Sequence, residues 1–205
     1  MNLTNYYWYF QSAIPHRICD DIVRYGKQLE DQMAVTGGLG DKKLNQKQIK
    51  DLKQKRDSNI VWMNDRWIYK EIQPYVHQAN RNAGWNFQWD WSESCQFTIY
   101  KPGQFYDWHC DSSDRPYEKE GPQNGKIRKL SVTVSLSDPK DYTGGQLEFK
   151  PINFNTGKQY TQVCKEILPK GSVCVFPSHM WHRVRPVKKG TRYSLVIWSC
   201  GWPFK

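Results

Sequence analysis

Residues 130–136 read Leu-Ser-Val-Thr-Val-Ser-Leu, and this strict alternation constrains the fold more than any other stretch of the chain. Neighbouring side chains of a β-strand point to opposite faces, so one face carries three small hydroxyls and the other carries four aliphatic groups. Two arrangements explain such a strand. Either its hydroxyl face is exposed to solvent at the surface of a sheet, or that face lines a barrel whose interior is polar because the barrel holds a polar ligand.

Further short runs of β-branched and aromatic residues follow Gly84, and Gly, Pro, Asp and Asn separate them. Short strands at this spacing are typical of a β-sandwich or a jelly roll. We therefore expect a mainly β fold in this part of the chain. Its predicted strands cover residues 85–91, 95–101, 105–110, 130–136, 146–149, 173–176 and 193–198.

The first 84 residues have a different pattern. The aromatic run that ends at Phe10 favours a strand, and apolar residues then recur at helical spacing behind Pro15. A second helix is predicted from residue 66 onward, with Asn64 and Asp65 as its cap and a kink at Pro74. Between the two helices, residues 35–58 are rich in lysine and poor in apolar groups. This segment is predicted to be a basic loop with room for one short helix.

The 205-residue chain suits one domain with a single core. It has no apolar run near the length of a membrane span, and residues 1–8 lack the basic and aliphatic segments of a secretory signal. Six cysteines without CxxC spacing favour reduced thiols. We expect a cytoplasmic protein without a membrane span.

The net charge of +10 comes from 30 Lys and Arg against 20 Asp and Glu. Residues 41–57 contribute a net +4, from seven basic and three acidic residues, and residues 183–192 contain five basic residues and no acid. A solvated basic face explains this balance, because such faces are common in proteins that bind no polyanion. Attraction to an acidic partner or to nucleic acid is the alternative.

Three side chains are candidate metal ligands. His109 and Asp111 are two residues apart on a predicted strand, so their side chains point to the same side. His182 follows another predicted strand and supplies the third ligand, although His179 competes with it. Two histidines and one carboxylate form the facial triad of non-haem Fe(II) oxygenases. Zinc accepts the same ligands and stays an alternative.

Arg192 favours iron over zinc. Alternation places Arg192, Ser194, Val196 and Trp198 on one face of the last predicted strand. A buried arginine needs an anion, and its guanidinium matches a carboxylate with two parallel hydrogen bonds. An oxygenase that uses a dicarboxylic keto acid needs such a partner, whereas a hydrolytic zinc enzyme has no general need for one. The alternative is that Arg192 lies on the surface among its basic neighbours.

These residues belong to a longer series of motifs over residues 95–200, about half of the chain. The series consists of Tyr100-x-x-Gly103-Gln104-x-Tyr106-x-x-His109-x-Asp111, Leu136-Ser137-Asp138, Gly144-Gly145-x-Leu147-x-Phe149, Gly171-x-x-x-x-Phe176-Pro177, His182-x-Val184 and Gly190-x-Arg192-x-Ser194-x-x-x-Trp198. It resembles the prolyl 4-hydroxylase-like branch of the 2-oxoglutarate- and Fe(II)-dependent oxygenases. Residues 56–62 and Trp67 resemble an upstream element of that branch.

The resemblance implies a double-stranded β-helix, which is a jelly roll, braced by N-terminal helices. Residues 1–84, including the basic loop 35–58, would support a catalytic core of residues 85–205 within one integrated domain. The resemblance further implies the site residues. His109, Asp111 and His182 would bind Fe(II); Arg192, Ser194, Tyr100 and Trp198 would bind 2-oxoglutarate; and Tyr106, Trp108, Trp181 and Arg56 are candidates for the substrate pocket.

Two positions depart from the pattern of the family. Many members have lysine where this chain has Arg192, and arginine should serve the same purpose. Ser135 stands where some relatives have a tyrosine that contacts the far carboxylate of 2-oxoglutarate. Arg192 and Ser194, helped by Tyr100, would then bind that carboxylate.

The implied activity is hydroxylation of an unactivated C–H bond with Fe(II), 2-oxoglutarate and O₂, and with ascorbate as an optional reductant. We expect a peptidyl substrate residue, above all proline, with residues 35–58 and 112–127 closing over the polypeptide. A free amino acid or another small molecule is the alternative. Nucleic-acid demethylation is disfavoured, because the demethylases place a second arginine where this chain has Trp198. A non-catalytic jelly-roll binding domain is disfavoured because every ligand position is filled. A monomer or homodimer is expected.

Overall fold

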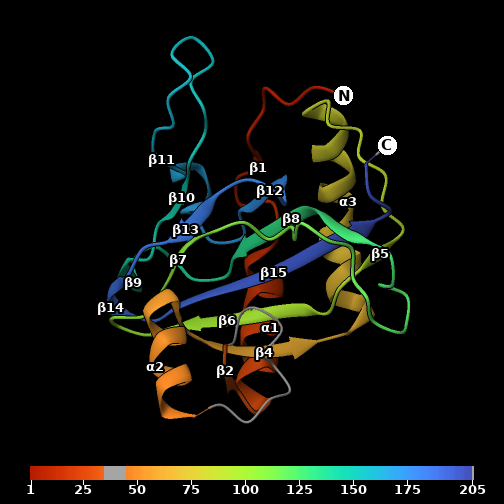
Figure 1. Cartoon of the computed structure of the whole chain (residues 1–205). Helices are drawn as coiled ribbons and strands as arrows, with labels where there is room; N and C mark the ends of the chain where they lie inside the picture. Colours follow the sequence, from red (N-terminus) through yellow and green to blue (C-terminus); the bar gives the residue numbers. More distant parts are fainter. Residues whose placement is uncertain (35–44, 205) are drawn as a thin grey trace.

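The computed structural model describes residues 1–34 and 45–204, and two antiparallel β-sheets dominate it (Figure 1). The larger sheet runs in the order β1 (Trp8–Phe10), β12 (Val173–Pro177), β8 (Ile127–Ser135), β15 (Arg192–Gly201), β6 (Cys95–Tyr100), β4 (Asn59–Met63) and β2 (Gln32–Met33), and β5 (Trp91–Ser92) pairs with β15. The smaller sheet runs β11 (Gln162–Val163), β10 (Leu147–Phe149), β13 (His182–Val184), β7 (Phe105–His109) and β3 (Arg56–Asp57). β14 (Val187–Gly190) and β9 (Tyr142–Gly144) form a separate ladder, and Lys165–Ile167 form a 3₁₀ turn. The predicted mainly β jelly roll, a double-stranded β-helix, is confirmed.

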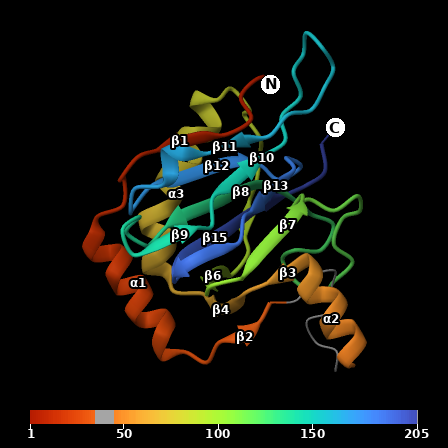
Figure 2. The ribbon, with the colours of Figure 1, turned by 90° about the vertical axis from the view of Figure 1, so that its left-hand side faces the viewer.

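Helices cover the outer face of the larger sheet. α1 (His16–Gln28) begins directly after Pro15, and α3 (Arg66–Asn82) begins after Asp65 and continues through Pro74. Both lie behind the larger sheet in Figure 1. α2 (Gln46–Lys55) is the one short helix allowed for in the predicted basic loop, and it lies next to β3 and β7 (Figure 2). Residues 35–44 of that loop lie outside the described residues. None of the described helices is long and apolar enough to span a bilayer.

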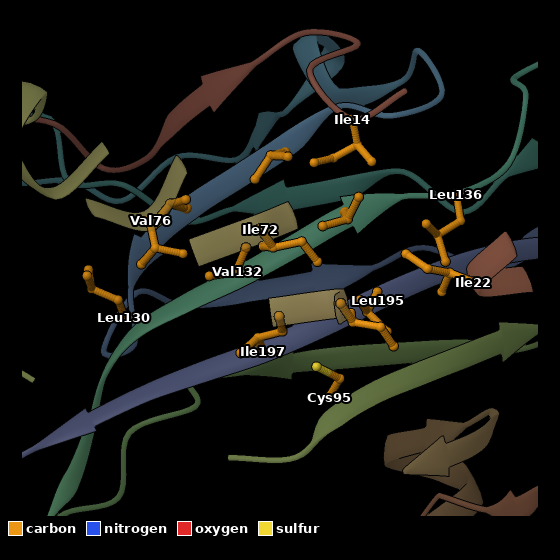
Figure 3. Close-up of a cluster of buried hydrophobic side chains, with 14 of the residues drawn as sticks. Ile14, Ile22, Ile72, Val76, Cys95, Leu130, Val132, Leu136, Leu195 and Ile197 are labelled. Atoms are coloured by element: carbon orange, nitrogen blue, oxygen red, sulfur yellow. The ribbon is translucent and has the colours of Figure 1, made fainter. Parts of the chain in front are cut away.

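The alternation of residues 130–136 places their aliphatic side chains in the main core. Leu130, Val132 and Val134 are fully buried and pack with Leu195 and Ile197 of β15 and with the apolar faces of α1 and α3 (Figure 3). The hydroxyl side chains of the same strand therefore point between the two sheets, as expected of a barrel with a polar interior. This face of the larger sheet carries the site described below.

The predicted strand at residues 85–91 is wrong, since only Trp91 belongs to a strand. The side chain of Asn80 satisfies the backbone of this segment instead. Its Oδ1 accepts a hydrogen bond from the Phe87 amide at 3.0 Å, and its Nδ2 donates one to the Phe87 carbonyl at 2.9 Å. Trp85 is fully buried in the core, so the aromatic residues of this segment pack without joining a sheet.

Gly26 allows α1 to approach the larger sheet closely. A Cβ atom at Gly26 would lie 2.6 Å from the Phe97 ring and 2.8 Å from the Met63 methyl group, so Gly26→Ala should overpack the core. We expect a net loss of about 1–2 kcal/mol in the free energy of unfolding, because overpacking outweighs the helix preference of alanine. Thermal unfolding should show a Tm lower by about 2–8 °C. Gln28→Ala, on the exposed side of the same helix, is the control, and an equal or higher Tm for Gly26→Ala would contradict the close approach.

Candidate active site

The three predicted metal ligands come together between the two sheets. His109 ends β7, Asp111 follows it by two residues, and His182 begins β13 directly opposite His109 in the ladder. The Nε2 atoms of His109 and His182 each lie 3.6 Å from a carboxylate oxygen of Asp111. One ligand atom from each of the three residues lies within 4.8 Å of the others. His179 is exposed and lies outside this cluster, so the register of β13 on β7 selects His182.

Backbone carbonyls orient both imidazoles. The Nδ1 atoms of His109 and His182 lie 2.7 Å from the Asp107 carbonyl oxygen and 2.9 Å from the Met180 carbonyl oxygen, respectively. A carbonyl oxygen can only accept a hydrogen bond, so each Nδ1 carries the proton and each Nε2 keeps a free lone pair. Both lone pairs are directed toward the cluster, which is the arrangement that a metal ion requires.

Asp111 and His182 have the charge states that bind a cation. Burial alone would raise the pKa of Asp111, but the imidazoles of His182 and His109 and the Arg128 guanidinium hold it well below its usual range. Burial and the neighbouring His109 lower the pKa of His182 to about 4. At neutral pH Asp111 is therefore ionised and His182 is neutral, as metal ligation requires.

Two serines hold the carboxylate of Asp111. The Ser131 hydroxyl donates a hydrogen bond to Asp111 Oδ2 at 2.7 Å and lies 2.9 Å from the Ser178 hydroxyl. The Ser178 carbonyl accepts the backbone amides of Asp111 and Ser112 at 2.9 Å. Sequence analysis did not assign these serines to the metal site, although the polar face of residues 130–136 was the available signal.

Ser131→Ala should weaken metal binding by roughly 10–100-fold, because hydrogen-bond partners of metal ligands contribute about this much. Equilibrium titration with Mn²⁺ or Co²⁺ measures the affinity independently of turnover. Ser172→Ala is the matched control, since Ser172 is equally buried and its hydroxyl accepts the Ser12 amide at 3.0 Å. Equal affinities for the two variants would show that the Ser131 hydroxyl does not orient Asp111.

Arg192 and Ser194 share a pocket with this triad. Arg192, Ser194, Val196 and Trp198 all line it, as the alternation of β15 predicts. Arg192 is 4% exposed, and its Nη1 donates to Ser194 Oγ at 3.2 Å. Tyr100, its partner in the ladder, also lines the pocket, with its ring centroid 5.5 Å from the guanidinium.

The Arg192 guanidinium is available for an anionic ligand. Within the part of the chain that the structure describes, no carboxylate lies at ion-pair distance from it. Gly145 makes room for this side chain, because a Cβ there would lie 2.9 Å from Arg192 Cδ. A buried guanidinium without a counter-charge is costly, so the arrangement fits a ligand that brings its own carboxylate.

A β-bulge brings Tyr106 to the same face as His109. Val184 pairs with Tyr106 and His182 pairs with His109, so β7 uses one more residue than β13 between the two pairs. Tyr106 consequently lines the pocket and stacks on the His109 ring, with the ring centroids 3.5 Å apart. Burial raises the pKa of Tyr106 to about 12, so its hydroxyl stays protonated at neutral pH.

The other three predicted pocket residues do not line the pocket. Trp108 points away from His109, its neighbour in β7, and its ring lies 4.4 Å from Lys150 Nζ and 4.6 Å from the Arg183 guanidinium. Trp181 is 45% exposed at the surface. Arg56 is buried behind Tyr106, with its guanidinium 4.4 Å from the Tyr106 ring centroid.

Sequence analysis missed several residues of the site. Gln96 and Thr133 line the pocket, and Arg128 stacks on Trp198 with its guanidinium 3.8 Å from the ring centroid. Gln96 shares a face of β6 with the predicted Tyr100, and Thr133 lies on the hydroxyl face of residues 130–136, so alternation could have found both. No local pattern connects Arg128 with Trp198, because strand pairing alone brings them together.

The chain belongs to the 2OG-Fe(II) oxygenase superfamily, whose family model matches residues 95–200. Among its relatives is the PKHD-type hydroxylase YbiX of Escherichia coli O157:H7, which is 36% identical over 103 residues. That alignment covers 50% of this chain but only 40% of the relative. The resemblance inferred from the motifs is confirmed.

Solved structures of prolyl hydroxylases share the fold. The viral collagen prolyl hydroxylase of Paramecium bursaria Chlorella virus-1 has a TM-score of 0.64 and 19% identity, over 97% of both chains. A Pseudomonas putida prolyl-4-hydroxylase has a TM-score of 0.64 and 20% identity, over 96% of this chain and 93% of that one. A Trichoplax adhaerens prolyl hydroxylase, in complex with a hypoxia inducible factor oxygen degradation domain peptide fragment, has a TM-score of 0.63 and 16% identity, over 96% of this chain and 84% of that one.

The residues present fit the two groups that give the superfamily its name. Two imidazole nitrogens and one carboxylate, all facing a pocket, match the ligand set of non-haem Fe(II) sites. The buried Arg192 guanidinium and the Ser194 hydroxyl match the far carboxylate of 2-oxoglutarate. Fe(II) and 2-oxoglutarate are thus supported by both the family and the geometry.

Proposed function

We propose that this protein is a 2-oxoglutarate- and Fe(II)-dependent dioxygenase that hydroxylates a peptidyl residue, with proline as the preferred target. The observation that carries the proposal is one pocket lined by both the facial triad and a buried arginine that has no carboxylate partner among the described residues. A non-catalytic binding domain has no need of this combination. Ascorbate as an added reductant and a cytoplasmic location stay predictions.

Each group in the pocket has a role in this proposal. Fe(II), O₂ and 2-oxoglutarate supply the oxidising chemistry when bound. His109, Asp111 and His182 would hold the metal, and Arg192 and Ser194 would fix the far carboxylate of 2-oxoglutarate. Tyr106 offers a hydroxyl donor to the substrate because its pKa of about 12 keeps the phenol protonated. The protein thereby orients a C–H bond and excludes water.

The charges of the pocket favour a peptidyl residue over a free amino acid. Apart from the two histidines that would bind the metal, Arg192 and Asp111 are the acidic or basic side chains that line the pocket among the described residues. Both are assigned in the proposal, so no further carboxylate or cation is left for the ammonium and carboxylate groups of a free amino acid. A peptidyl residue lacks these charges and needs no such partners.

Aromatic rings beside the pocket favour an extended peptide. Trp62 of β4 is 43% exposed, and its ring centroid lies 6.3 Å from that of Trp198. Aromatic-lined surfaces bind proline-rich segments, because such segments are extended and lose little entropy on binding. The Trichoplax relative in complex with a peptide fragment adds support from a protein of the same fold.

Incubation with a peptide library, Fe(II), 2-oxoglutarate and O₂ tests the proposal. We expect a gain of 16 Da on proline-containing peptides, with one succinate formed per hydroxylation and no gain when 2-oxoglutarate is left out. Peptides with alanine in place of the proline are the matched controls. Mass gain on free amino acids alone, or demethylation of an oligonucleotide, would overturn the peptidyl substrate.

A further inference from the structure

A partly buried ion pair lies beside the pocket wall. Arg128 Nε and Nη2 donate to Glu93 Oε1 and Oε2 at 2.6 and 2.5 Å, which is a bidentate pair. The Arg128 guanidinium also lies 3.8 Å from the ring centroid of Trp198, a pocket-lining residue. The pair therefore holds a positive group over a ring of the pocket wall.

Further hydrogen bonds hold Glu93 in place. The Tyr117 hydroxyl donates to Glu93 Oε1 at 2.9 Å, and the Cys200 thiol lies 3.4 Å from the same oxygen. The side chains of Glu93 and Arg128 are 15% and 21% exposed. Since Glu93 is fixed from three sides, it remains on Arg128 rather than exchanging it for solvent or for another partner.

Lys126, which directly precedes β8, is neutralised as well. Lys126 Nζ lies 2.7 Å from Asp90 Oδ1. In a chain with a net charge of +10, Arg128 and Lys126 are therefore each paired with a carboxylate, whereas Lys129 Nζ lies 4.4 Å from the Phe204 ring centroid. An unpaired Arg128 would attract a carboxylate strongly, whereas the pair with Glu93 has no net charge and leaves an acidic side chain that approaches it without a cationic partner.

We propose that Glu93 is a specificity-determining residue, which neutralises Arg128 and thereby favours substrates with an uncharged residue next to the target. This inference rests on the proposed peptidyl substrate. Glu93 is a positioning residue and does not contact the reacting atoms. It acts through the charge and position of Arg128 on Trp198.

The test uses the peptide that gains 16 Da in the library, made as a pair with Asn or Asp next to the target residue. For the wild type we expect kcat/KM to be at least about fivefold higher for the Asn peptide, which is a modest charge effect. Glu93→Gln keeps the shape and frees the charge of Arg128, so it should lower the Asn-to-Asp ratio by about tenfold, mainly through KM for the Asp peptide. Added salt should reduce this change, because it screens the freed charge.

Two further variants separate the effect of the Arg128 charge from the effect of a lost hydrogen bond to Glu93. Tyr117→Phe removes a hydrogen bond and leaves the ion pair, so it should keep the wild-type ratio. The double variant Glu93→Gln, Arg128→Gln removes both charges and should restore the preference that Glu93→Gln loses. An unchanged ratio in Glu93→Gln would overturn the role of Glu93 while the proposed function stands. A library without any hydroxylated peptide would overturn both.

Discussion

Replacing His182 by alanine should abolish 2-oxoglutarate turnover. The variant loses one of three side chains whose ligand atoms lie within 4.8 Å of one another. We expect a loss of more than about 100-fold in Fe(II) affinity and in succinate formation, since a direct ligand outweighs the 10–100-fold effect of its hydrogen-bond partners. Metal titration and a succinate assay measure the two quantities separately.

His179→Ala is the matched control for this prediction. His179 lies three residues before His182 but is exposed and outside the cluster, so its removal should leave metal affinity and turnover within about twofold, as is usual for surface substitutions. Thermal unfolding of both metal-free variants checks that the effect is not a loss of folding. Equal losses in the two variants, or a His182→Ala protein that still binds Fe(II) tightly, would contradict the ligand assignment.

The parts of the site that follow a local period could be predicted from the sequence. Alternation alone placed Arg192, Ser194 and Trp198 on one face, and the structure brings all three to the pocket. The same period explains residues 130–136, whose aliphatic face packs into the core while the Ser131 hydroxyl reaches Asp111. An alternating pattern predicts which side chains share a face, because the pleat of a strand points successive side chains to opposite sides.

Features that depend on strand register could not be predicted in this way. By position alone His182 and His179 are equivalent candidates; the family resemblance assigned His182, and the pairing of His182 with His109 is the physical reason. A bulge that no side-chain pattern marks turns Tyr106 into the pocket. Glu93, between β5 and β6, and Arg128 of β8 form their ion pair across 35 residues of chain, so only the folded arrangement of the sheet brings them together.

The N-terminal region was predictable in its helices but not in its sheet contacts. α1 and α3 have the apolar spacing that predicts helices, but the predicted cap of α3 is wrong in one respect, since the Asp65 side chain makes no capping hydrogen bond. β3 is only Arg56–Asp57, and its polar side chains resemble those of the lysine-rich segment before it. Its pairing with β7 is a backbone interaction, which leaves no trace in the pattern of side chains.

Arg192→Met should raise the KM for 2-oxoglutarate by roughly 100–4,000-fold. Removing one partner of a buried, hydrogen-bonded ion pair costs about 3–5 kcal/mol, and each 1.4 kcal/mol is about tenfold in affinity. Arg192→Lys keeps the charge but loses the two parallel hydrogen bonds to the carboxylate. Its KM for 2-oxoglutarate should therefore lie between those of Arg192→Met and the wild type. Steady-state kinetics with varied 2-oxoglutarate measures the change, and Arg185→Met, on an arginine whose side chain is 49% exposed, is the control.

The thermal stability of Arg192→Met without 2-oxoglutarate separates a role of Arg192 in binding from a role in folding. In the ligand-free protein Arg192 is buried without a carboxylate partner among the described residues, so replacing it by an apolar side chain should leave the Tm unchanged or raise it. Saturating 2-oxoglutarate at 100 times its Kd should stabilise the metal-loaded wild type by about 2.7 kcal/mol, and the variant hardly at all at the same concentration. A lower Tm for the ligand-free variant, together with an undiminished stabilisation by 2-oxoglutarate, would show that Arg192 serves folding rather than cosubstrate binding.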